Sequence, residues 1–572
     1  MDSQLVPISP MAAVSNGGDG GKTTMDRKGG WKSAIFIIFV EMAERFSYYG
    51  IAGNLITYLT TVLGQPTATA ARNVNTFLGV SALFPILGAF LADSYVGRFK
   101  TIVVSTTVYI LGLVMLVVAS TAALRRHSAL FFLALYTVSV GEGGHKPCVQ
   151  TFAADQFDED LPAEKEAKSS FFNWWYLGIV VGATLAVLVV IYVEDFVGWT
   201  VGYGMLAAAT VLALAVFLAG SRTYAKEAPV GSPFTRVAHV VAAAVRKRRL
   251  SEERDGRGIL YGDGGEIGGA AAADDERLRT RALARTNQFR FLDKATIIDD
   301  TDVSSEKRNP WRLCSVSQVE EVKLLLRLIP IWLSCLTFAA VIAQQGTFFT
   351  KQAATLDRSL GSFHFPPASF QVVTSTTILI SVALYDRLLV PAARRLTGLP
   401  SGITVLQRIG TGLVLSAVAM TVAGALETKR LRVAAAHGLL DSPTATLPMP
   451  IWWLAPQYVL TGLGDVFTIV GLQELFYDQM PVQMRSTGAA LYLSIVGVGN
   501  FLSGVLITIV QRISARSGHQ WLLNNLNRSH LNYFYWLLAG LSAVNFCIYV
   551  FAAKAFVYKK VEAAAMEEPA KV

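Results

Sequence analysis

Long apolar runs separated by short polar stretches make up most of this chain. The runs contain about 20 residues or more, the length that a helix needs to cross the hydrocarbon core of a bilayer. A soluble protein of this size would show shorter, periodic runs. Only helices and closed barrels satisfy the backbone in lipid, and these runs are too long and uniform for barrel strands. The pattern therefore predicts membrane-spanning helices.

The runs fall into two groups of six around one polar stretch. This plan predicts an all-α membrane protein with twelve transmembrane helices in two six-helix halves, as in transporters built from parallel repeats. In such folds the substrate lies between the halves near the middle of the membrane. The expected spans are 33–62, 74–92, 101–121, 129–153, 171–193, 200–220, 323–349, 368–390, 404–426, 451–476, 487–511 and 532–556.

The same pattern divides the chain into five parts. Residues 1–32 are expected to form a disordered cytosolic tail, and 559–572 a second cytosolic tail. The two six-helix bundles are expected at 33–220 and 323–558, joined by a cytosolic linker at 221–322.

An amphipathic pattern begins the linker at Pro233. It fits a helix that lies on the membrane surface, and it fits a helix packed against the bundle equally well. The alanine and basic residues that follow Val240 continue the same pattern.

Basic residues predict the orientation in the membrane. They gather in cytosolic loops, and the linker holds about a third of the 50 Lys and Arg residues. Both termini and the linker are therefore expected in the cytosol, which an even number of spans also requires. The basic loop 427–450 is the exception, because the number of spans places it outside. The sequon at Asn527 also falls outside, which makes Asn527 a candidate glycosylation site.

Composition supports a membrane protein and excludes several other classes. The 572 residues are 52% hydrophobic and only 16% charged, against roughly 25% charged in an ordinary soluble domain. The net charge of +9 is accounted for by cytosolic loops, so no nucleic-acid partner is expected. The four cysteines form no disulfide framework. The sequence shows no metal cluster, catalytic triad or phosphate-binding loop, so we expect no enzyme, no metal and no cofactor.

Three charged residues in the first span point to function. Glu41, Glu44 and Arg45 follow the apolar run Phe36–Val40, and each charge inside lipid costs roughly 2.5–3.5 kcal/mol. Positions i, i+3 and i+4 share one face of a helix, so the three side chains point the same way. They are expected either to face a watery cavity or to form static ion pairs that fix helix packing.

Further ionisable residues occur in the fourth and tenth spans. Lys146 needs a carboxylate nearby, and either Glu142, one turn earlier, or the glutamates of the first span would serve. Its neighbour His145 is expected to be packed. In the tenth span Glu474 has no cation within one turn, and Asp465 fits a packing role as well as a functional one.

The charged stretch Glu41–Gly50, together with five later stretches, resembles motifs of the proton-dependent oligopeptide transporters, which in plants form the nitrate/peptide transporter family within the major facilitator superfamily. The stretch Glu41–Gly50 resembles the family's ExxER motif, and Gly88–Arg98 resembles the superfamily's loop between helices 2 and 3. Four further matches follow in the family's order along the chain: Phe171–Tyr176, Gly231–Phe234, Phe291–Ala295 and Ile451–Tyr458.

The resemblance implies a major facilitator fold and specific residue roles. Glu41, Glu44 and Arg45 would couple the proton and pair with Lys146. Tyr48, in the same motif, and Glu474 would contact the substrate. Asp93 and Arg98 match residues that lock the two halves, and Thr101 aligns with a regulatory threonine and is a candidate phosphorylation site, although threonines at helix starts are often caps.

Two departures from the family bear on the substrate. Peptide carriers place an arginine after Tyr-Tyr-Gly, where this chain has Ile51 and Ala52. A plant dual-affinity nitrate carrier has a histidine in helix 7, where Ile342 stands here. The resemblance thus implies a proton symporter for a small anionic or zwitterionic solute such as nitrate, an organic acid or a hormone-like compound.

Two alternatives stay open at this point: a di- or tripeptide symporter, and a solute-sensing transceptor with little transport. The expected partners are the small-molecule substrate, protons and the lipid bilayer. The plasma membrane is expected before the vacuolar membrane, and the sequence leaves the oligomeric state open.

Overall fold

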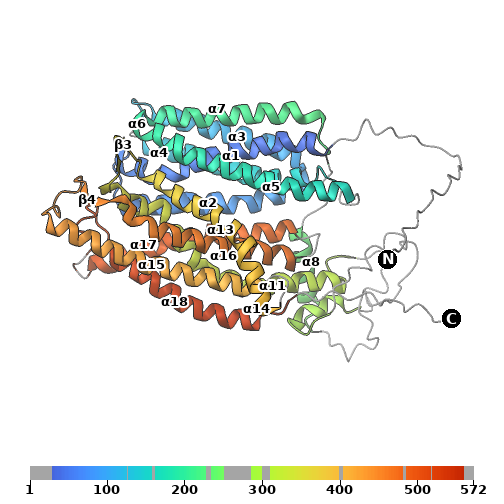
Figure 1. Ribbon diagram of the computed structural model, residues 1–572. Coiled ribbons are helices and arrows are strands. Elements are labelled where there is room, and N and C mark those ends of the chain that lie inside the picture. The colour runs from blue at the N-terminus through green and yellow to red at the C-terminus, as the bar shows by residue number, and fades with distance from the viewer. Residues whose placement is uncertain are drawn as a thin grey trace, which may run out of the picture.

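The apolar runs form long helices that lie side by side in two groups, coloured blue to green and yellow to red in Figure 1. The computed structural model describes residues 29–124, 127–157, 162–226, 233–249, 285–298, 309–398, 403–480, 485–516, 518 and 520–558.

The first half contains six helical rods, three of which include a short π or 3-10 segment, labelled η. In chain order the elements are α1 (Trp31–Thr61), α2 (Thr67–Leu91) with η1 (Ala92–Val96), α3 (Arg98–Ser120), α4 (Ser128–Ala154), α5 (Pro162–Leu185) with η2 (Ala186–Val190) and α6 (Ile191–Phe196), and α7 (Trp199–Ala219) with η3 (Gly220–Arg222).

The second half repeats this plan after the segments α8 (Pro233–Arg246) and η4 (Arg290–Thr296). Its rods are α11 (Val316–Ile342) with η5 (Gln345–Phe349) and α12 (Thr350–Ala354), η6 (Ala368–Gln371) with α13 (Val372–Leu384), η7 (Tyr385–Leu389) and α14 (Val390–Thr397), α15 (Val405–Ala436), η8 (Ile451–Leu454) with α16 (Ala455–Gln479), α17 (Arg485–Arg516), and α18 (Leu531–Ala555).

Four very short strands mark one end of the bundle, which we call the β end, and α8 lies at the opposite end, the α8 end (Figure 1). β1 (Leu356–Asp357) pairs in parallel with β4 (Leu447–Pro450), and β2 (Ser359–Leu360) pairs antiparallel with β3 (Phe363–His364). The strands therefore join loops and form no layer of their own.

Each of the twelve predicted spans contains a helix, and ten helices in the described part of the chain are long and apolar enough to cross a membrane. The two outside this set are α1 and α4, with 31 and 27 residues. These two helices carry the charged residues of the ExxER motif and Lys146, which lowers their apolar content. The all-α fold with many membrane helices follows from the hydropathy pattern.

The two halves join most fully at the β end. One buried apolar cluster there contains residues of both halves, for example Leu55 and Phe77 of the first and Phe349 and Leu538 of the second. At the α8 end each half has its own cluster. Along the seam Gly79 of α2 faces Gly497 of α17, and a Cβ on Gly79 would lie 3.1 Å from the Gly497 carbonyl oxygen. Glycine at both positions lets the two helices approach closely.

The described part of the linker is folded against the second half. Lys323 at the start of α11 is wholly buried, and its Nζ lies 2.5 Å from Asp293 Oδ1 of η4 and 2.8 Å from Glu320 Oε1. A buried apolar cluster joins α8, η4 and α11, including Val240, Leu292 and Val319. Helix α8 thus contacts protein through this cluster, and its placement on the membrane surface stays a prediction. The cytosolic location of the linker stays a prediction.

Helix α15 ends ten residues later than predicted, at Ala436 instead of 426. The prediction was wrong because charged residues from Glu427 onward looked like a loop. In the structure Glu427 and Arg430 are both fully buried and pair with one another one turn apart. A charge that is neutralised within one turn does not end a helix.

Candidate functional site

The predicted cluster on α1 is brought together as its spacing indicated. Arg45 Nε donates a hydrogen bond to Glu41 Oε1 at 2.8 Å, and the same Nε lies 2.8 Å from Glu44 Oε2. All three side chains are buried, with Glu44 only 4% exposed. One guanidinium therefore holds two carboxylates.

This cluster is incompletely neutralised. Glu41 Oε2 and both oxygens of Glu44 accept no hydrogen bond from any described residue. One guanidinium balances only one of the two buried carboxylates. The two carboxylates repel each other, which favours a proton on one of them. The geometry of Glu41, Glu44 and Arg45 is thus suited to binding and releasing a proton.

Lys146 lies on α4 and makes its ion pair with Glu142. Its Nζ is 3.2 Å from Glu142 Oε1, and the ammonium group also lies 4.8 Å from the centre of the Tyr48 ring on α1. Of the two expected partners, the structure selects the carboxylate one turn away. A pairing of Lys146 with Glu41 or Glu44, implied by the resemblance, is not the arrangement seen here.

His145 is packed, as expected. Its Nδ1 lies 2.8 Å from the Thr106 hydroxyl of α3, and the ring is buried. The neighbouring glycines allow this close packing, since a Cβ on Gly143 or Gly144 would press on α2 or α3.

The second half contributes Glu474, and the sequence analysis missed its partner. Arg408 of α15 approaches Glu474 of α16, with its Nη1 3.2 Å from Oε2. The guanidinium also lies over the Tyr385 ring, 4.2 Å from its centre. Arg408 was recognisable as a lone charge in the ninth apolar run, but it lies 66 positions from Glu474 and only the fold shows the contact. Glu474 is the more accessible of the two, at 40% side-chain exposure.

Asp465 lies two and a half turns before Glu474 on α16, at about 3.6 residues per turn. It is partly buried, and its Oδ1 accepts no hydrogen bond from the described residues. Asp465 therefore adds a second acidic group to this helix.

Asp93 and Arg98 bond to each other at the end of α2. Arg98 Nε lies 3.1 Å from Asp93 Oδ1, and Arg98 also pairs with Asp155 at the end of α4. All three residues belong to the first half. In this conformation the group joins α2, α3 and α4, and a locking role between the halves stays a prediction.

Thr101 stands in the first turn of α3 and is buried. Its hydroxyl donates to the Gly97 carbonyl at 3.0 Å, which occupies the group that a kinase would modify. Phosphorylation of Thr101 stays a prediction that would require this helix start to open.

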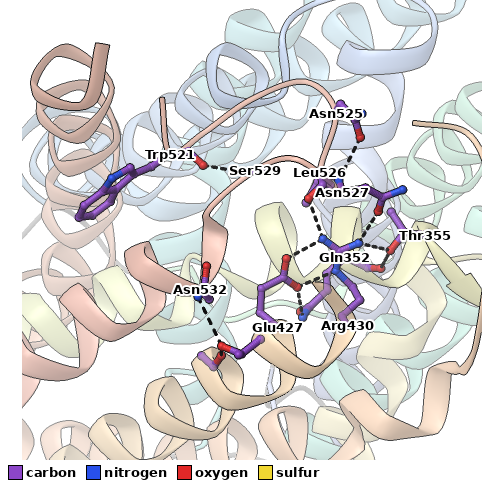
Figure 2. Close-up of polar contacts among 12 residues, drawn as sticks. Gln352, Thr355, Glu427, Arg430, Trp521, Asn525, Leu526, Asn527, Ser529 and Asn532 are labelled. Atoms are coloured by element: carbon purple, nitrogen blue, oxygen red, sulfur yellow. Dashed lines mark hydrogen bonds and ion pairs between the residues drawn. The ribbon is translucent and has the colours of Figure 1, made fainter. Parts of the chain in front are cut away.

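A second buried charged cluster, at the β end of the second half, is fully satisfied (Figure 2). Arg430 donates to both oxygens of Glu427, at 2.8 and 2.6 Å. Its remaining bonds go to Asn527 Oδ1 at 2.7 Å, the Leu526 carbonyl at 2.8 Å and Thr355 Oγ1 at 3.3 Å. Gln352 donates to Glu427 Oε2 at 2.7 Å. The cluster joins α12, α15 and the loop before α18.

Asn527 is part of this cluster and is 2% exposed. Its amide nitrogen donates to the carbonyls of Leu439 and Ser442, at 3.0 and 3.1 Å. Glycosylation would need that nitrogen to be free and exposed. The geometry therefore favours a structural role for Asn527 over the predicted modification.

No group of three or more potential metal ligands among His, Cys, Asp and Glu occurs in the described residues.

The fold has two six-helix groups with charged residues on α1, α4 and α16, which is the plan that the sequence predicts for a membrane transporter. A family model described as the POT family matches residues 99–523. The chain is 55% identical over 543 residues to the Arabidopsis thaliana protein NRT1/PTR family 5.4, which covers 94% of this chain and 96% of that protein. It is 47% identical over 571 residues to NRT1/PTR family 5.10 from the same plant, covering 97% and 98%.

Solved structures agree on the fold. An auto-inhibited POT family peptide transporter matches with a TM-score of 0.67 at 21% identity, over 92% of this chain and 97% of that chain. The POT family transporter PepTSo matches with a TM-score of 0.68 at 20% identity, over 92% and 98%. This chain belongs to the POT family and to its plant NRT1/PTR branch. It is a multi-pass membrane protein with a major facilitator fold, and it is a proton-coupled solute transporter.

Proposed function

We propose that this protein is a symporter that moves a small anionic or zwitterionic solute together with protons by alternating access. The observation that carries the proposal is the Glu41–Glu44–Arg45 cluster, in which two buried carboxylates share one guanidinium. A proton on Glu44 leaves Arg45 paired with Glu41 alone. The net charge of this cluster then changes with each proton bound, which couples proton transfer to solute binding.

Three cations on the helices of the candidate site support an anionic substrate. Arg45, Lys146 and Arg408 supply three cations, and a carboxylate or nitrate group accepts hydrogen bonds from such donors. Glu474 is the expected acceptor for a substrate amine. Because Arg408 already pairs with Glu474, an amine would have to compete with a guanidinium for that carboxylate. An incoming anion would likewise compete with the carboxylates that these three cations already hold. The proposed preference for anions over peptides therefore rests on the arginine that is missing at Ile51 and Ala52.

The conformation fits one step of the cycle. The halves are joined at the β end and carry separate apolar clusters at the α8 end. With the linker in the cytosol, this arrangement corresponds to an inward-facing state. A proton moving with the membrane potential gains about 2.3 kcal/mol per 100 mV, which drives uptake from outside. The plasma membrane is the proposed location.

Glu44→Gln tests the proposal. In proteoliposomes this variant should lose uptake driven by a pH gradient and keep exchange of labelled for unlabelled solute, because the amide mimics a permanently protonated carboxyl. Asp441→Asn, in an exposed loop, is the matched control and should behave like the parent protein. Net uptake that stays pH dependent in Glu44→Gln would exclude the assignment. A panel of nitrate, organic acids, plant hormones and dipeptides in the same assay identifies the substrate.

One other substrate class has a supporting observation. One similar solved structure is that of a POT family peptide transporter, and another POT family transporter was solved with 5-aminolevulinic acid, a zwitterion. A di- or tripeptide substrate would appear as peptide-dependent uptake in the same panel. A solute-sensing transceptor would bind solute and signal with little transport.

A further inference from the structure

A second pair of carboxylates lies at the β end of the first half. Glu194 and Asp195 stand on α6, and Asn54 of α1 faces both. Asn54 comes ten residues after Glu44, which is about 15 Å along a helix. The pair is therefore separate from the Glu41–Glu44–Arg45 cluster, although α1 contributes to both.

The two carboxylates share a single neutral donor. Asn54 Nδ2 donates to Glu194 Oε2 at 3.1 Å and to Asp195 Oδ1 at 2.9 Å. Glu194 is 1% exposed, and its Oε1 accepts no hydrogen bond within the described part of the chain. No ion pair to Glu194 occurs among the described residues either.

The surrounding helices leave room for the Glu194 side chain. Gly202 of α7 packs directly on it, and a Cβ at that position would overlap the Glu194 side chain. The rings of Tyr58 and Tyr203 pack against each other beside it, 5.9 Å apart between centres. Burial without an ion-pair partner disfavours a charged carboxylate.

The groups that face the pair come from three elements. Glu194 faces Asp195 on its own helix, Tyr203 of α7, and Asn54 of α1, close to Tyr58. Arg358, just before β2, acts on Asp195. The neutral amide of Asn54 cannot balance two negative charges. Arg358 balances at most one of them, so one negative charge remains without a cation. A proton on one of the two carboxylates would remove this surplus charge.

The site lies where the two halves touch. Gln371 of the second half donates to the Gly53 carbonyl at 3.1 Å, next to Asn54. Ser369 donates to the Val187 carbonyl at 2.7 Å, seven residues before Glu194. The Phe363 ring of β3 stacks on Tyr192, two residues before Glu194, at 5.7 Å between centres. When the halves part at the β end, these contacts break on both helices that form the site.

We propose that Glu194, Asp195 and Asn54 form a second proton-binding site, loaded when the halves close at the β end and emptied when they part there. The inference rests on the proposed function, since the site changes the balance between the two end states of the same alternating-access cycle. The sign follows from linkage: closure takes up a proton, so acid favours the closed β end. One linked proton changes the ratio of closed to open molecules by at most about tenfold per pH unit.

Infrared spectroscopy of the purified protein tests the proton itself. A protonated carboxylic acid has a carbonyl stretch that a carboxylate and an amide lack. The difference spectrum between the parent protein and Glu194→Gln at neutral pH should show loss of such a band. The same difference for Asp441→Asn should show none. An unchanged band in Glu194→Gln, together with an unchanged band in Asp195→Asn, would overturn the proposal.

Thiol labelling tests the coupling to closure. Phe363→Cys in a Cys547→Ser background places a reactive thiol at the β end, since the cysteines at 148, 314 and 335 are buried. Labelling by a membrane-impermeant reagent should fall as the pH is lowered, when it is measured at each pH relative to the same thiol in the denatured protein, which corrects for the pH dependence of the thiol itself. The Asp441→Asn control should show the same slope as the parent. Glu194→Gln should flatten this dependence, and Asp195→Asn is the second variant if the first does not reach the membrane. The same slope in the parent and in both variants would overturn the proposal.

The two proposals fail separately. If Glu44→Gln abolishes proton-driven uptake but Glu194→Gln leaves the band and the labelling slope unchanged, only the second site is wrong. If Glu44→Gln keeps pH-dependent uptake, the assignment of the first cluster is wrong whatever Glu194 does.

Discussion

The two buried clusters on α1 and α15 use the same residue types to opposite effect. On α1 one arginine serves two glutamates, and three of four carboxylate oxygens accept no hydrogen bond from the described residues. On α15 one arginine serves one glutamate, and five bonds fix its guanidinium (Figure 2). The difference teaches that stoichiometry and hydrogen bonding, more than burial, separate a titratable cluster from a structural one.

The α15 cluster should be the most sensitive to a single substitution. Arg430→Met leaves Glu427 buried without its cation, and breaking a buried pair costs about 3–5 kcal/mol. The variant should unfold at a much lower temperature in detergent. The double variant Glu427→Gln with Arg430→Met removes both charges and should regain much of that loss. Equal losses in the single and double variants would show that the cluster is not held by charge pairing.

The α1 cluster should tolerate the corresponding change. Glu44→Gln removes the surplus negative charge and leaves Arg45 paired with Glu41, so the free energy of unfolding should change by roughly 1 kcal/mol or less. Thermal unfolding of this variant beside Glu427→Gln makes the contrast direct. A loss in Glu44→Gln as large as in Glu427→Gln would mean that the α1 cluster is also structural.

The sequon at Asn527 offers a milder test of the α15 cluster. Ser529→Ala removes the sequon and leaves the Asn527 amide, and its bond to Arg430, in place. Because that amide is buried and bonded, the parent protein should carry no glycan there. The variant and the parent should therefore migrate equally on a gel, with or without endoglycosidase treatment. A faster-migrating Ser529→Ala protein would show that Asn527 is modified before the loop folds.

The exposed pair Asp441–Arg528 should have the smallest effect. Arg528 donates two hydrogen bonds and holds the pKa of the Asp441 carboxyl below its usual range. A lowered pKa in the folded protein contributes stability above the unfolded pKa, and this contribution is lost as the pH falls through the folded pKa. Solvent screens the pair, so unfolding temperatures of Asp441→Asn and the parent should differ little at neutral pH and converge in acid. Divergence in acid would contradict this sign.

Hydropathy could predict the fold because it depends on composition alone. The ends of the predicted runs 101–121 and 532–556 lie within one to three residues of the ends of α3 and α18. The end of α15 was mispredicted for a local reason, since a neutral pair one turn apart reads as two charges. Helical spacing likewise predicted that Glu41, Glu44 and Arg45 share a face.

Contacts between helices were out of reach. Nothing in the sequence placed Arg408 beside Glu474, because 66 positions separate them. Nothing placed Asn54 beside Glu194 and Asp195 either, because Asn54 lies 140 positions or more before them. The choice of Glu142 over the α1 glutamates for Lys146 also depended on how α1 and α4 pack.

The sequence by itself determined that the chain crosses the membrane many times and that charges on α1 stand in an unusual place. Both follow from the cost of polar groups in lipid, which each residue carries with it. Only the tertiary structure decided which of the buried charges are balanced. Neutralisation depends on atoms within about 4 Å. Some of these atoms lie one turn away on the same helix, as for Arg430 and Glu427, but others belong to helices far apart in the sequence, as for Arg408 and Glu474.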